Sequence, residues 1–133
     1  MKNKNQYSIE DLLDVMSELR NKCPWDQKQT FDTLKKLTIE ETYELVDAID
    51  KKKYDDIKDE LGDLLLHIIF YSKIASENKK FNFNDVLNSL IEKLIYRHPH
   101  IYGDIKVSSI DEVKKNWERL KVEDKNKGIL SGV

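Results

Sequence analysis

Apolar residues recur every three or four positions along most of this chain, and the apolar–polar alternation that is typical of strands is nearly absent. Only four glycines and two prolines occur in 133 residues, of which 36% are charged. Long helices suit such a composition, whereas a loop-rich β fold needs more turn residues. The pattern therefore predicts an all-α fold, a helical bundle of about four to five helices.

Capping residues mark where these helices begin. Ser8 has the position of an N-cap for the first helix, and Asn84 has the same position for the fourth. We expect one domain over residues 1–133, with its core at about 8–123 and a flexible tail at 124–133. The predicted helices span residues 9–20, 32–51, 54–78, 84–97 and 110–123.

The composition also limits the class of protein. The net charge of −2 gives no general affinity for nucleic acid. Cys23 has no second cysteine to pair with, which suits a reducing compartment. The polar Met1–Tyr7 segment lacks a signal-peptide core, and the apolar Leu64–Tyr71 stretch is too short to span a bilayer. We expect a soluble cytoplasmic protein without membrane or nucleic-acid partners.

Two acidic pairs at helical spacing are the features from which a function can be argued. Glu41 and Glu44 form the first pair, directly after Glu40. Glu60 and Asp63 form the second pair on the next predicted helix. Residues three apart share one helix face, and on a helical wheel both pairs interrupt apolar stripes. Each pair can therefore direct two carboxylates toward the interior of the bundle.

Four inward carboxylates repel one another unless a cation or a proton lies between them. A hard divalent ion with oxygen ligands resolves this repulsion, and an all-oxygen ligand set favours Mg²⁺, or Mn²⁺ in its place, over zinc. The chain contains no Glu-x-x-His unit, which ranks a di-iron bundle low. The competing interpretation is a pair of ordinary helices whose acidic residues are solvated.

Other candidate residues carry weaker signals. His67 lies one turn after Asp63, close enough to hydrogen-bond it, and a role as a core residue or as a partner of a metal ligand is favoured over direct metal coordination. Lys93 and Arg97 are four apart on one predicted helix and are candidates for binding phosphate oxygens, although surface cations are common there. The two tryptophans, Trp25 and Trp117, are candidates for stacking on a base, with core packing as the simpler role.

Inward carboxylates, a divalent ion and nearby cations together describe a polyphosphate site. The chain has no glycine-rich phosphate loop, so a P-loop enzyme is excluded. A metal-dependent enzyme acting on a nucleotide polyphosphate is the leading interpretation. A structural bundle leaves the inward carboxylates unexplained.

These residues resemble the MazG family of nucleoside triphosphate pyrophosphohydrolases from about Leu12 to Leu120. The core of the resemblance is Glu-Glu-x-x-Glu, at residues 40–44, followed by Glu-x-x-Asp, at residues 60–63. The flanking stretches that also look like the family are Cys23-Pro24-Trp25-Asp26-Gln27-x-Gln29-Thr30, Glu60-Leu61-Gly62-Asp63-Leu64-Leu65, Arg97-His98-Pro99-His100-Ile101-Tyr102-Gly103 and Asn116-Trp117.

The resemblance implies an all-α fold that assembles as a homo-oligomer, a dimer or a tetramer. It implies Mg²⁺-dependent cleavage of nucleoside triphosphates (NTPs or dNTPs) between the α and β phosphates, giving a monophosphate and pyrophosphate. The expected role is clearance of excess or non-standard nucleotides. Two alternatives stay open: a diphosphatase selective for dUTP or dCTP, and a non-catalytic nucleotide-binding regulatory subunit.

The resemblance also assigns roles to individual residues. It implies that Mg²⁺ is held by Glu41, Glu44, Glu60 and Asp63, and that Glu40 orients or deprotonates the attacking water. Glu40 and Glu41 are the expected catalytic residues. Lys93 and Arg97 match positions that contact the triphosphate, and Trp117 matches a position near the nucleotide. His67 stands where many family members carry Gln. The chain holds one copy of a domain that often occurs in tandem, and it looks most like the first domain of tandem members.

Overall fold

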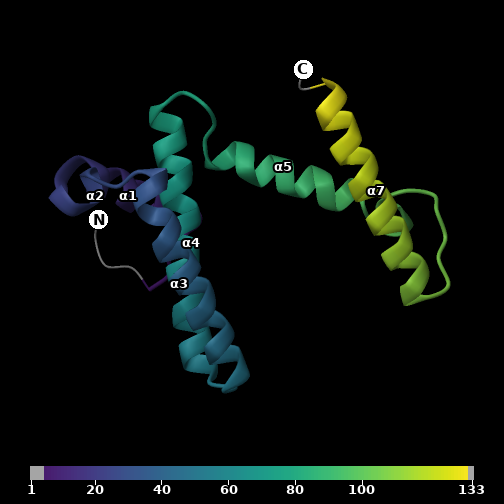
Figure 1. Cartoon of the computed structure of the whole chain (residues 1–133), viewed down its shortest axis with the longest axis horizontal. Helices are drawn as coiled ribbons and strands as arrows, with labels where there is room; N and C mark the ends of the chain where they lie inside the picture. Colours follow the sequence, from purple (N-terminus) through teal and green to yellow (C-terminus); the bar gives the residue numbers. More distant parts are fainter. Residues whose placement is uncertain (1–4, 132–133) are drawn as a thin grey trace. The chain divides into compact units, whose positions relative to one another are not determined.

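The structure, a computed structural model, describes residues 5–131, with side chains described up to residue 126. Within these residues helices are the only regular secondary structure and no strand occurs, which confirms the predicted all-α fold (Figure 1). No helix among them is both long enough and apolar enough to cross a bilayer. The helices are α1 (Ile9–Lys22), α2 (Pro24–Gln27), α3 (Phe31–Asp50), α4 (Tyr54–Glu77), α5 (Phe83–Tyr96), α6 (Pro99–Tyr102) and α7 (Ile110–Ser131).

The chain forms two compact units, Met1–Phe83 and Asn84–Val133, which are described separately below. In the first unit, α3 and α4 lie side by side as an antiparallel hairpin, and α1 packs against α4 (Figure 1). The core of this unit brings together buried side chains from all three helices, namely Met16, Leu34, Ile69, Phe70 and Ile74. The single domain that the sequence suggests for residues 1–133 stays a prediction.

Local sequence signals fix the ends of the helices in the first unit. Ser8 caps α1, as predicted, and forms a capping box with Asp11. The turn between α3 and α4 is tight because Lys52 adopts a left-handed conformation, with φ of 56°. The Lys53 amide then donates to the carbonyl of Ala48, which closes the end of α3. This turn sets how far α4 runs back along α3.

Two predicted helix boundaries are wrong. The helix expected after Asn84 begins at Phe83, so Asn84 lies inside its first turn; Phe83 packs partly buried against the core of the first unit. The helix expected to end at Glu123 continues to Ser131, and Asp124 on this extension forms an ion pair with Arg97. Whether the segment from 124 onward is flexible stays a prediction, and residues 132–133 lie outside the described part.

Candidate metal centre

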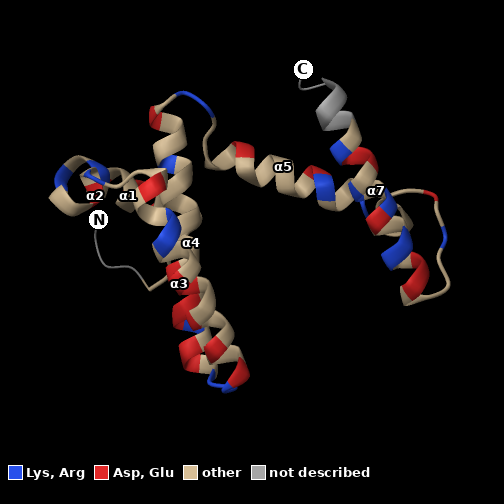
Figure 2. Cartoon of the chain, viewed as in Figure 1, with Lys and Arg blue, Asp and Glu red and all other residues tan. Residues whose placement is uncertain are grey.

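Three acidic side chains converge where α3 and α4 face each other. Glu41 on α3 and Glu60 and Asp63 on α4 each offer one carboxylate oxygen, and these oxygens all lie within 4.8 Å of one another. Red acidic positions line both helices of this hairpin in Figure 2. The antiparallel pairing brings residues 19 and 22 positions apart in sequence to one point, as the acidic spacing predicts.

Two carboxylates of this triad hold a buried oxygen without a hydrogen-bond partner. Glu41 Oε2 and Glu60 Oε2 are buried and accept no hydrogen bond. Desolvation, followed by the proximity of Glu41 and Glu44, raises the pKa of Glu60 to about 7. Desolvation also raises the pKa of Glu41, with Glu44 and Asp63 adding to the shift and the contact with Glu60 opposing it. Unpartnered oxygens of this kind suit a hard divalent cation, so the residues fit the predicted Mg²⁺ or Mn²⁺.

Glu44 and Glu40 lie outside this triad. Glu44 lines a hollow of about 400 Å³ at the turn end of the hairpin, together with Glu60 and the two lysines Lys51 and Lys53. Its charge nevertheless acts on both Glu41 and Glu60. Glu40 is exposed on α3. The roles of Glu44 as a ligand and of Glu40 toward the attacking water stay predictions.

His67 is buried on α4 and is bonded within the hairpin. Its Nδ1 lies 2.7 Å from the hydroxyl of Thr38 on α3, and the same hydroxyl contacts that of Tyr71. Burial lowers the pKa of His67, although Asp63 opposes the shift. The expected role of His67 as a core residue agrees with these contacts. Asp63 acts on His67 through its charge, and the hydrogen bond of His67 is made to Thr38. Sequence reasoning missed Thr38 and Tyr71, although Thr38 lies one turn before Glu41.

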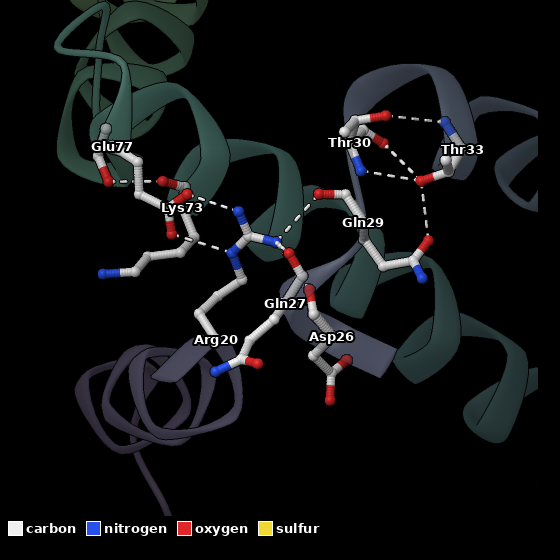
Figure 3. A network of polar contacts seen from close by, with 9 residues as sticks. Arg20, Asp26, Gln27, Gln29, Thr30, Thr33, Lys73 and Glu77 are labelled. Atoms are coloured by element: carbon white, nitrogen blue, oxygen red, sulfur yellow. Dashed lines mark hydrogen bonds and ion pairs between the residues drawn. The ribbon is translucent and has the colours of Figure 1, made fainter. Parts of the chain in front are cut away.

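Arg20 holds the segment that connects α1 to α3 (Figure 3). Its guanidinium donates to both carboxylate oxygens of Glu77, at 2.9 and 2.6 Å, and to the carbonyls of Asp26 and Gln29, at 2.7 and 3.0 Å. The Gln29 side chain is buried and accepts a hydrogen bond from the Thr33 hydroxyl. These contacts give the stretch at residues 23–30 a structural role, because they anchor the segment that leads into α3.

Trp25 belongs to the anchored segment, but its side chain is 57% exposed. Its backbone carbonyl accepts a hydrogen bond from the Gln29 side chain. Core packing, the simpler role considered for Trp25, is therefore wrong. Its predicted contact with substrate is untested.

In the second unit, Lys93, one of the predicted phosphate-binding cations, lies on α5, and Arg97, the other, directly follows the end of this helix. Arg97 forms an ion pair with Asp124 at 3.3 Å, and its guanidinium carbon lies 5.8 Å from the centre of the Trp117 ring. Lys121 lies 5.1 Å from the centre of the same ring. Lys93 lines a separate hollow of about 340 Å³ within this unit. Arg97 and Trp117 are thus brought together as one group, and their contacts with substrate stay predictions.

The chain is similar in sequence to known proteins. Residues 29–102 match the sequence profile described as the MazG nucleotide pyrophosphohydrolase domain. The chain is 44% identical over 120 residues to the nucleoside triphosphate pyrophosphohydrolase of Escherichia coli (strain K12), with 88% of this chain and 46% of that protein covered. It is 47% identical over 121 residues to the nucleoside triphosphate pyrophosphohydrolase/pyrophosphatase MazG of Thermotoga maritima, with 90% and 46% covered. The chain therefore spans about half the length of these relatives.

A solved structure shares the fold. The crystal structure of a mazG-related protein from Thermotoga maritima superposes with a TM-score of 0.71 at 26% sequence identity. The match covers 84% of this chain and 97% of that one.

Proposed function

The chain belongs to the MazG nucleotide pyrophosphohydrolase family, and on that basis we propose that it hydrolyses nucleoside triphosphates to nucleoside monophosphate and pyrophosphate with the help of Mg²⁺. The observation that carries this proposal is the triad of Glu41, Glu60 and Asp63, which gathers three carboxylate oxygens within 4.8 Å of one another. Two of these residues hold a buried oxygen without a hydrogen-bond partner. Such a site attracts a divalent cation and, through it, a polyphosphate.

Under this proposal the triad holds Mg²⁺, with Glu44 joining it from the next turn of α3, and Mn²⁺ can substitute. The bound ion would offset the negative charge of the phosphates and increase the acidity of water. Glu40, exposed beside Glu41, orients the water that attacks the α-phosphorus or accepts its proton. Pyrophosphate then leaves as the α–β bond breaks.

Four further residues are proposed to hold the substrate. Lys93 and Arg97 bind phosphate oxygens, since a planar guanidinium matches the geometry of phosphate. Trp117 already lies against the Arg97 guanidinium and contributes an aromatic surface near the nucleotide. Trp25 offers a second, exposed aromatic surface for the base. The cellular role that we propose is clearance of excess or non-standard NTPs and dNTPs in the cytoplasm.

We also propose that the chain works as a homo-oligomer, a dimer or a tetramer. No residue of α5 is buried, although its apolar residues include Leu90 and Ile91, which are 52% and 44% exposed. On α3, Ile39 and Ile49 are similarly exposed, at 57% and 50%. Apolar helix faces of this kind require cover. Light scattering after size-exclusion chromatography tests this, and a monomer at micromolar concentration would refute it.

Substitution of the triad tests the catalytic proposal. Glu41→Gln and Asp63→Asn should each abolish pyrophosphate release from nucleoside triphosphates while the helical circular-dichroism signal is retained. Asp32→Asn is the matched control, because Asp32 lies at the start of α3 and pairs only with Lys35 among the contacts described. Full activity in both triad variants would refute the assignment, whereas binding without product in the unmodified protein would favour a regulatory subunit.

A further inference from the structure

A partly buried hydrogen-bonded group bridges α3 and α4 beside the acidic triad. The Thr38 hydroxyl on α3 contacts His67 Nδ1 at 2.7 Å, the Tyr71 hydroxyl, and the carbonyl of Leu34 at 3.1 Å. The Tyr71 ring stacks on Phe31, the first residue of α3, with ring centres 5.5 Å apart and planes 2° apart. One hydroxyl thus joins two turns of α4 to α3.

The hydrogen-bonding capacity of Thr38 fixes the direction of each bond. A hydroxyl has one hydrogen to donate and two lone pairs to accept with. The Leu34 carbonyl can only accept, so Thr38 donates to it. All three contacts are then satisfied only if Tyr71 and His67 both donate to Thr38. The structure therefore places the hydrogen of the His67 ring on Nδ1, and every lone pair of the Thr38 oxygen is used.

This bridge lies one helical turn from the acidic triad on both helices. Thr38 precedes Glu41 by three residues on α3, and His67 follows Asp63 by four residues on α4. A slide of one helix along the other by one residue would move the carboxylates about 1.5 Å relative to one another. A shift of that size is large for a site whose ligand oxygens must surround a single ion.

We propose that Thr38, His67 and Tyr71 are positioning residues that set the register of α3 against α4 and so hold Glu41 at metal-binding distance from Glu60 and Asp63. The inference rests on the proposed metal-dependent function. It assigns no direct contact with metal or substrate to the three residues. Their effect passes through the backbone of the two helices to the carboxylates.

The test measures Mn²⁺ affinity directly, from the electron paramagnetic resonance signal of free Mn²⁺ in the absence of nucleotide. Thr38→Val keeps the shape of the side chain and removes the bridging oxygen. We expect the Mn²⁺ affinity to fall by about tenfold. This is the lower end of the roughly 10- to 100-fold loss that follows removal of a group that orients a metal ligand. At saturating Mn²⁺, kcat should recover toward the unmodified value, since the ligands themselves remain.

Ser72→Ala is the matched control. Ser72 is buried on α4, and its hydroxyl donates only to the Ile68 carbonyl of the same helix, at 2.9 Å. Its loss removes a buried hydroxyl without touching the bridge between helices. Equal Mn²⁺ affinities in Thr38→Val and Ser72→Ala would overturn the inference, even if both variants were destabilised.

A second pair of variants covers the possibility that Thr38→Val does not fold. His67→Gln keeps an N–H that donates to Thr38, whereas His67→Met has similar size and no donor. Gln should therefore retain most of the Mn²⁺ affinity, and Met should lose it by about tenfold. Equal affinities in the two variants would overturn the inference. Thermal unfolding of both variants identifies any general loss of stability.

Failure of this inference is distinguishable from failure of the proposed function. An unmodified protein that binds Mn²⁺ but releases no pyrophosphate would refute the activity, while weaker Mn²⁺ binding in Thr38→Val would still support the positioning role. An unmodified protein that binds no Mn²⁺ would overturn both.

Discussion

Replacing Arg20 by Met is the substitution whose cost can be worked out most completely from the contacts. Methionine keeps a flexible apolar stem against Phe70, over which the guanidinium carbon lies at 5.8 Å, and removes the charged head. The lost polar contacts are the paired bonds to Glu77, an exposed bond to the carbonyl of Gln27 that water can replace, and the part-buried bonds to the carbonyls of Asp26 and Gln29. The Arg20 side chain is only 12% exposed, so water reaches the two part-buried carbonyls poorly.

The contributions can be added in order of magnitude. Each part-buried carbonyl that loses its donor costs about 1 kcal/mol. The ion pair adds about 1 kcal/mol, since the Glu77 side chain is 35% exposed and water can solvate it once Arg20 is gone. The total is about 3 kcal/mol of unfolding free energy, or roughly 10 °C in the unfolding midpoint of a chain of this size.

Urea unfolding at one protein concentration and pH 7 measures this loss, with Glu77→Gln as the comparison. Glu77→Gln removes only the charge pairing and should cost about 1 kcal/mol. The reasoning predicts that Arg20→Met costs about threefold more than Glu77→Gln. Equal costs would refute it, because the bonds to the backbone carbonyls would then contribute nothing.

Three further predictions concern charge, the turn and the core. In the metal-free protein, the unfolding temperature in thermal scans should fall as pH rises from about 4.5 through 7. The reason is that the raised pKa values of Glu41 and Glu60 favour their protonated forms in the folded state. Excess Mg²⁺ should remove this fall. Lys52→Gly should stabilise by about 0.5–1 kcal/mol in urea unfolding, since glycine adopts φ of 56° without strain, and a loss of stability would contradict this. Leu34→Ala should cost about 3 kcal/mol in the same assay, since the side chain is 1% exposed, and a loss under 1 kcal/mol would contradict its place in the core.

The sequence predicted that Glu41, Glu44, Glu60 and Asp63 converge, and three of the four do, because helix spacing and hairpin pairing are local properties. It could not place Glu44, which shares a face with Glu41 but is rotated from it by about 60° around the helix axis. That rotation, together with a rise of about 4.5 Å along α3, carries Glu44 to the hollow beside the turn. A helical wheel gives the direction of each side chain around one helix axis, but it gives no distance to residues on a neighbouring helix.

Hydrogen bonds between side chains on different helices could not be predicted from the pattern of each helix alone. Thr38 bonds to His67, 29 residues away, and Arg20 bonds to Glu77, 57 residues away. The pair formed by Arg97 and Asp124 was missed for a related reason, since the last helix was expected to end at Glu123. Neither proline nor a glycine at a left-handed position ends that helix before Ser131.

Product analysis tests the central claim most directly. Purified protein is incubated with each NTP and dNTP, with Mg²⁺ and with EDTA, and the phosphorus-containing products are identified. We predict metal-dependent release of nucleoside monophosphate and pyrophosphate in equal amounts, with none in EDTA. A strong preference for dUTP or dCTP would narrow the enzyme to a selective diphosphatase. Release of nucleoside diphosphate and phosphate, or no product at all, would contradict the account.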